Sequence, residues 1–98
     1  MTETDVSQAP AGATFYRVSE DGHRLRRLRV VVPATPDGAI RVAEVFPDGR
    51  VDAPQRCGVS YLVRQYHPTF EAARQARVAE LEGYLAHARA LQPPEDET

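Results

Sequence analysis

Hydrophobic and polar residues alternate along the first half of the chain, in short runs separated by turns rich in glycine and proline. Alternation with a period of two is typical of strands that bury one face. The runs predict strands over residues 14–18, 24–32, 39–46 and 50–53. Because the connecting turns are short, we expect consecutive strands to pair as an antiparallel meander.

The second half of the chain follows a longer period. Residues 70–91 carry apolar side chains at spacings close to the ~3.6 residues of a helical turn, which predicts one amphipathic helix. Thr69 has the side chain expected of its N-cap. The preceding segment, residues 59–66, fits either a fifth strand or a helical turn, because its apolar residues alternate over too short a run.

The expected fold is therefore an α+β domain, with an antiparallel meander of three to five strands packed against one long C-terminal helix. This domain should span residues 13–91. Residues 1–12 and 92–98 lack apolar periodicity and are rich in polar and acidic residues. They are predicted to be a flexible arm and a flexible acidic tail.

The turn lengths also predict which side chains share a face of the sheet. The expected core face carries Phe15, Leu28, Val30, Val32, Ala39, Ala43, Val45, Val51 and Ala53. The expected opposite face carries Tyr16, Leu25, Arg27, Arg29, Val31, Ile40, Val42, Glu44, Phe46, Arg50 and Asp52. On it, Arg27 and Glu44 are predicted to form a cross-strand pair. One helix cannot cover both faces, so residues 59–66 or another molecule should cover the second face.

Charge is distributed unevenly along this chain of 98 residues, whose net charge is −2. All twelve basic residues are arginines and lie in residues 13–91, where nine acidic residues leave an excess of three positive charges. The two ends carry five acidic residues and no basic ones. This excess is too small to indicate nucleic-acid binding on charge alone.

The densest arginine cluster lies in residues 24–29 and supports an alternative function as a nucleic-acid-binding module. Its arginines and Arg41 would contact phosphates, and Tyr16 and Phe46 would stack on bases. The competing interpretation is a structural strand, whose arginines pair with nearby carboxylates and cover apolar surface.

The sequence offers little catalytic chemistry. Cys57 is the only cysteine, so no internal disulfide is expected, and a Cys57–His67 catalytic pair is the weakest hypothesis because no family signature surrounds it. The histidines are not at metal-ligand spacings, and the Asp-Gly glycines predict turns rather than a phosphate loop. We therefore expect no enzyme activity, no metal and no cofactor.

The expected function is a small non-catalytic interaction module that acts through its sheet face or its long helix. Its partner would most simply be a second copy of the chain, or else another protein. The candidate partner or nucleic-acid face comprises Tyr16, Arg27, Arg29, Phe46 and Arg50. Because the sequence shows neither a secretory signal nor an apolar run of membrane-spanning length, we expect a cytoplasmic protein without membrane contact.

Overall fold

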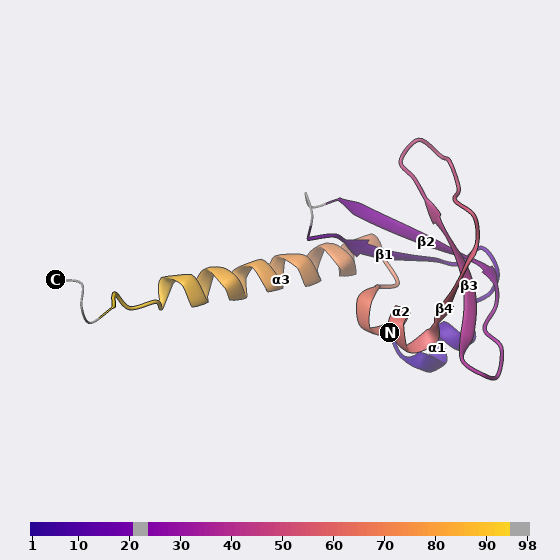
Figure 1. Ribbon diagram of the computed structural model, residues 1–98, viewed down its shortest axis with the longest axis horizontal. Helices are drawn as coiled ribbons and strands as arrows, with labels where there is room; N and C mark the ends of the chain where they lie inside the picture. Colours follow the sequence, from indigo (N-terminus) through magenta and orange to yellow (C-terminus); the bar gives the residue numbers. More distant parts are fainter. Residues whose placement is uncertain (21–23, 95–98) are drawn as a thin grey trace.

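The computed structural model describes residues 1–20 and 24–94, and confirms the predicted α+β class (Figure 1). One small antiparallel sheet is covered on one side by two short helices, and a longer helix extends from its edge. In chain order, the elements of the described residues are α1 (Glu3–Ser7), β1 (Thr14–Val18), β2 (Leu25–Val32), β3 (Ala39–Val45), β4 (Gln55–Gly58), α2 (Val59–Gln65) and α3 (Phe70–Arg89).

The sheet is the predicted meander, with strand order β1-β2-β3-β4 and every neighbouring pair antiparallel. Its fourth strand, however, is not where the alternation placed it. The predicted strand 50–53 is reduced to one bridge between Val45 and Val51, although that pairing is the expected one. Pro54 has no amide hydrogen to donate to the ladder, so regular pairing with β3 resumes only at Gln55, the first residue of β4.

The ambiguous segment 59–66 is helical, and the strand alternative is wrong. Within it, Val59, Leu62 and Tyr66 are all buried. Their spacing of three and four residues is that of one helix face. α2 ends at Gln65, in agreement with the bias of the residue before Pro68 against helical backbone.

The N-terminal residues also differ from the prediction of a flexible arm, since residues 3–7 form α1. Thr2 and Asp5 make a reciprocal capping box, in which each side chain accepts a hydrogen bond from the other's backbone amide, at 3.1 and 2.9 Å. Val6 is fully buried in the main hydrophobic cluster. A helix of five residues is too short to show a sequence period, which explains why the pattern missed it. Of the predicted acidic tail, residues 95–98 lie outside the described part of the chain.

The faces of the sheet differ from the prediction because the register of β2 with β3 differs by one residue. The turn lengths predict that Phe15 pairs with Arg26, but it pairs with Leu28, a shift of two residues that keeps the predicted faces. They predict that Val30 pairs with Arg41, but it pairs with Val42, a shift of one residue. A change of one residue moves a side chain to the other face. Ile40, Val42, Glu44 and Phe46 therefore lie on the side of α1 and α2, whereas Ala39, Ala43 and Val45 lie on the opposite side. The length of the turn at residues 19–22 predicts that Val18 pairs with His23, but Val18 pairs with Leu25. His23 itself lies outside the described residues.

The main core fills the space between the sheet and the two short helices. Its buried members are Val6, Ala9, Phe15, Val30, Ile40, Val42, Val59, Leu62 and Tyr66. We call this side of the sheet the inner face and the opposite side the outer face. No described helix covers the outer face. Residues 59–66 instead cover the inner face, where they pack against Ile40 and Val42, two residues of the predicted second face.

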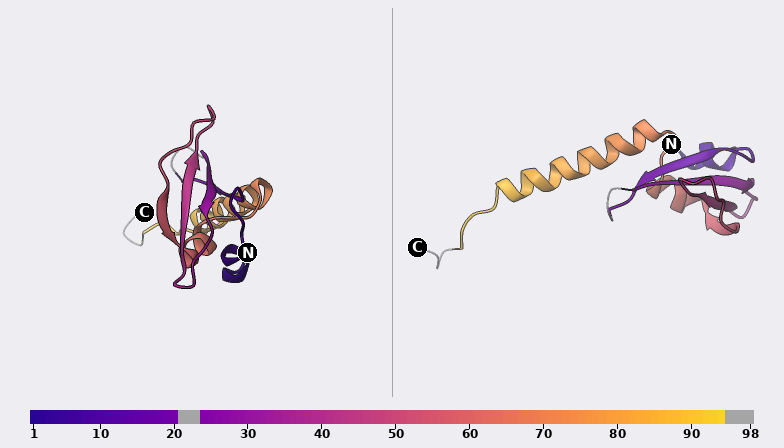
Figure 2. Two further views of the ribbon diagram at one scale, coloured as in Figure 1. Left: turned by 90° about the vertical axis from the view of Figure 1, so that its right-hand side faces the viewer. Right: turned by 90° about the horizontal axis from the view of Figure 1, so that it is seen from above.

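The long helix does not lie across the sheet as predicted. Among its described residues only Ala73 is buried, in the first turns, which pack beside β1. The remainder of α3 projects past the end of β1 (Figures 1 and 2). The molecule is therefore elongated, with extents of 60 × 32 × 22 Å and a radius of gyration of 17.6 Å. A compact domain of this length would have a radius of gyration of about 13 Å.

Candidate functional site

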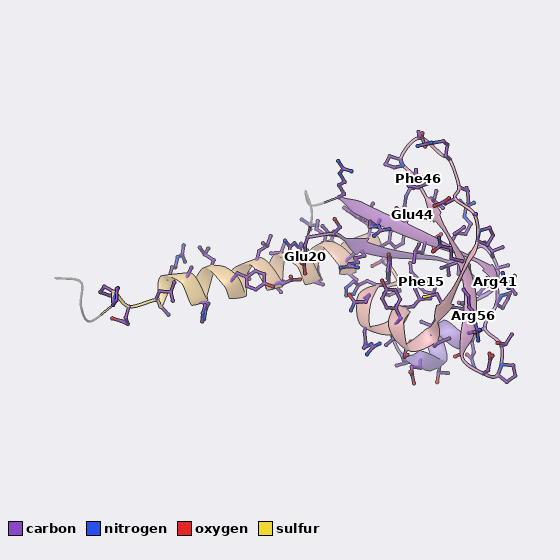
Figure 3. The ribbon with its side chains drawn as sticks, in the orientation of Figure 1. Phe15, Glu20, Arg41, Glu44, Phe46 and Arg56 are labelled. Atoms are coloured by element: carbon purple, nitrogen blue, oxygen red, sulfur yellow. The ribbon has the colours of Figure 1, made fainter. Side chains whose placement is uncertain are left out.

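The outer face of the sheet carries one sign of charge. Within the described strands, the charged residues on this face are Arg27, Arg29, Arg41 and Arg56. The one acidic residue of these strands, Glu44, lies on the inner face opposite Leu28. In Figure 3, Arg41 and Arg56 lie on the side of the sheet away from Phe15. The alternation of the strands thus separates a basic surface from the core.

These arginines have few partners. Arg27 donates a hydrogen bond from Nη2 to the carbonyl oxygen of Phe46 at 3.1 Å. Arg56 forms a long ion pair of 3.4 Å with Asp37. The side chains of Arg29 and Arg41 make no hydrogen bond or ion pair with any residue that the structure describes. Two guanidinium groups of this face are therefore free to bind an anion.

An aromatic residue stands beside the arginines. Tyr16 is half-buried on β1 and is the cross-strand partner of Arg27. Its backbone also bonds to His67, with both N–H···O distances at 2.8 Å. Partners in an antiparallel ladder direct their side chains to the same face, so His67, Tyr16 and Arg27 form a row across the edge of the sheet.

On the inner face, Glu44 forms an ion pair with a different arginine from the predicted Arg27. Glu44 binds Arg26 rather than Arg27, with Nη2–Oε1 and Nε–Oε2 distances of 2.6 and 3.4 Å. Its hydrogen bond to Glu44 raises the pKa of Arg26 above the ordinary value. Beside this pair lies a shallow hollow of about 750 Å³, whose lining includes Arg17, Arg24 and Phe46.

The five residues predicted to form one partner face are thus divided. The structure brings Tyr16, Arg27 and Arg29 together on the outer face. Phe46 lines the hollow on the inner side, and the guanidinium carbon of Arg50 lies over its ring, 5.4 Å from the centroid. The arginines of residues 24–29 are divided in the same way, because Arg24 and Arg26 line the inner hollow.

Sequence reasoning missed Arg56, which joins Arg41 on the outer face. The alternation of apolar and polar residues that would predict β4 is weak, because this strand has only four residues and follows Pro54. Arg41 was included only in the nucleic-acid alternative. Its place beside Arg29 depends on the register of β2 with β3, which turn length alone did not give.

A second surface lies on the uncovered part of α3. Large apolar side chains there are substantially exposed, between 38% for Leu81 and 60% for Tyr84. Val78, Leu81 and Leu85 are spaced by three and four residues, so they form one stripe. Ion pairs of Arg74 with Glu71 and of Arg77 with Glu80, at 2.5 and 2.8 Å, lie nearer the start of the helix.

The residues of the weakest catalytic hypothesis are far apart in the sheet. Cys57 lies on β4, at one edge, whereas His67 bonds to β1, at the other edge. Burial raises the pKa of the Cys57 thiol, which favours its unreactive protonated form. The structure therefore does not assemble a Cys57–His67 pair.

Neither metal ligation nor a membrane span is apparent in the described part of the chain. No three His, Cys, Asp or Glu side chains gather there as a metal site would require. No helix among the same residues combines the length and apolar character needed to cross a bilayer.

Comparisons with protein-family models, curated proteins and solved structures give no match for this chain. The arginines of the outer face and the α3 stripe are therefore the surfaces of the described chain that suggest a function.

Proposed function

We propose that the protein is a non-catalytic interaction module that forms a homodimer through α3. The observation that carries this proposal is the exposed apolar stripe of Val78, Leu81 and Leu85 on a helix in which only Ala73 is buried among the described residues. Single exposed apolar residues are common on monomers, but a continuous stripe on a projecting helix is typical of an association surface.

The low stability expected of an isolated helix of this length favours a partner for the projecting part of α3. Isolated helices shorter than ~12–15 residues are marginal in water, and the projecting part of α3 is of that size. Gly83 lowers its helix propensity by about 1 kcal/mol relative to alanine. Burying each half-exposed leucine of the stripe would contribute roughly 1 kcal/mol. Association would therefore stabilise both the interface and the helix that forms it.

A second copy of the chain is the simplest occupant, because the stripe can pack against itself across a two-fold axis. We propose an antiparallel pair. The sheet lies only beside the first turns of α3, so antiparallel helices place the two sheets at opposite ends of the dimer. The helix macrodipoles also oppose each other favourably in this arrangement.

Sedimentation equilibrium tests the proposal with two matched double variants. The wild-type protein and an Ala79→Gln/Ala86→Gln variant, changed on α3 outside the stripe, should sediment as dimers. A Leu81→Gln/Leu85→Gln variant should sediment as a monomer with an unchanged circular dichroism spectrum of the sheet. A monomeric wild type at high protein concentration, or equal dissociation by both variants, would contradict the proposal.

A further inference from the structure

The outer face of the sheet combines features that a merely solvated face does not need. Solvated faces usually mix both signs of charge, because opposite charges in cross-strand positions are stabilising and like charges are destabilising. Here the four strand arginines have no acidic residue among them on that face in the described strands. Arg41 and Arg56 are even direct cross-strand partners. Such an arrangement is favourable when an anion lies over it.

The spacing of these arginines fits an extended polyanion better than a single small anion. Arg27 and Arg29 are two residues apart on β2, hence about 7 Å along the strand. Arg41 and Arg56 continue the surface across β3 and β4, at about 5 Å per strand. Between the arginines, the outer-face residues Ala43 and Val45 are both buried. The positive charges thus extend across three neighbouring strands.

Tyr16 adds a second kind of contact at one end of this surface. It lies next to Arg27 and is only half-buried. Aromatic rings on a sheet stack on unpaired bases, and arginines beside them bind the phosphates. Within the described strands, the exposed apolar residues of this face are Leu25 and Val32, at the two ends of β2. They do not surround the charges as they would on a lipid-binding surface.

We propose that the outer face binds single-stranded nucleic acid, with Arg27, Arg29, Arg41 and Arg56 on the phosphates and Tyr16 stacked on a base. This function goes beyond dimerisation through α3. Because the outer face and the α3 stripe share no residue, failure of either proposal leaves the other intact. The overall negative charge of the chain does not oppose this binding, because five of its acidic residues lie in the two ends.

Fluorescence anisotropy with a labelled oligouridylate of roughly ten nucleotides tests this proposal. Binding should weaken as salt increases, with a log–log slope of about −0.7 for each phosphate contacted. Three or four contacts predict a slope between roughly −2 and −3. No binding at low salt, or an affinity independent of salt, would overturn the proposal.

Two double variants locate the binding surface. Arg29→Gln/Arg41→Gln should weaken binding by about tenfold or more and make the slope shallower by roughly 1.4. Arg64→Gln/Arg89→Gln removes the same charge from exposed residues of α2 and α3, and should keep the wild-type slope. Equal losses in the two variants would show that net charge, not this face, causes binding, and would overturn the assignment.

Tyr16→Leu tests the stacking contact, because it leaves the charges unchanged. It should weaken binding by about tenfold without changing the salt slope. Competition then identifies the class of polyanion. Unlabelled single strands should displace the probe, whereas polyglutamate and anionic phosphatidylserine vesicles should not. Displacement by either of these as effective as displacement by single strands would overturn the choice of nucleic acid.

Discussion

Arg41 of β3 and Arg56 of β4 are direct cross-strand partners, so two guanidinium groups face each other on the outer side of the sheet. The only ion pair that either arginine makes within the described chain is that of Arg56 with Asp37, at the long distance of 3.4 Å. Both arginine side chains are exposed, so solvent and salt screen their repulsion. The pair therefore destabilises the free protein modestly and favours a bound anion.

Replacing one member of this pair should stabilise the free protein. Arg41→Glu places opposite charges across the strands, and we expect it to raise the free energy of unfolding by about 0.5 kcal/mol at low salt. Urea denaturation at low and high salt measures this change, which should shrink as salt increases. The same variant should lose oligonucleotide binding, so stability and binding would change in opposite directions.

Arg64→Glu is the matched control, since it makes the same charge change at an exposed residue of α2. It should leave oligonucleotide binding unchanged. If Arg41→Glu destabilised the protein at low salt more than Arg64→Glu does, the repulsion inferred from the register would be refuted.

Val6 provides a test of the N-terminal helix as part of the core. Its side chain is fully buried between α1 and the sheet cluster. Val6→Ala should lower the free energy of unfolding by about 2 kcal/mol, from lost burial and an unfilled cavity. Ser7→Ala, at an exposed position of the same helix, should change it little. Equal stability of the two variants in urea would mean that α1 adds nothing to the core.

The elements that the sequence predicted best are those with a sustained local pattern. The strand at residues 14–18 agrees with β1, and the long helix begins at Phe70 as expected from Thr69. Thr69 accepts a hydrogen bond from the amide of Ala72 at 3.1 Å, as an N-cap should. Short elements without a period were lost, namely α1 and β4.

The candidate site was harder to predict than the fold, because it depends on register rather than on local pattern. The irregularity between Val30 and Val32 shifts the pairing of β2 with β3. This shift places Val42 in the core and Ala43 beside Arg29 on the outer face. Such a bulge has no reliable signature in three consecutive valines, so alternation alone could not give the face of each arginine.

Alkaline titration tests the burial of Tyr66. Burial raises the pKa of its phenol above the ordinary 10.0. Above about pH 10 the unfolded chain therefore loses this proton while the folded chain keeps it, and stability falls as pH rises toward the folded pKa. Tyr66→Phe removes this group and should lessen the fall above pH 10, as measured by urea denaturation.

Cys57 causes a second loss of stability, which begins at a lower pH than the loss caused by Tyr66. Burial also raises the pKa of its thiol, from an ordinary 9.0, so its contribution to the fall begins about one pH unit lower. Cys57→Ala should lessen the loss that begins near pH 9 and leave the tyrosine contribution in place. If the stability profile of Tyr66→Phe were parallel to that of the wild type up to pH 11, the buried phenol would not account for the alkaline loss.

Disulfide cross-linking tests the antiparallel arrangement of the dimer. In a Cys57→Ser background, two proteins carry a single new cysteine in the stripe, Val78→Cys or Leu85→Cys. In an antiparallel pair with its axis near Leu81, residue 78 of one copy lies beside residue 85 of the other, since both are about one helical turn from the axis. After subunit exchange, oxidation of the mixture should therefore yield mainly the mixed 78–85 product. A parallel pair brings identical positions together, so it would give the 78–78 and 85–85 products even from each protein alone. Mass spectrometry distinguishes these products, and a predominance of the identical-position disulfides would refute the antiparallel dimer while leaving dimerisation itself supported.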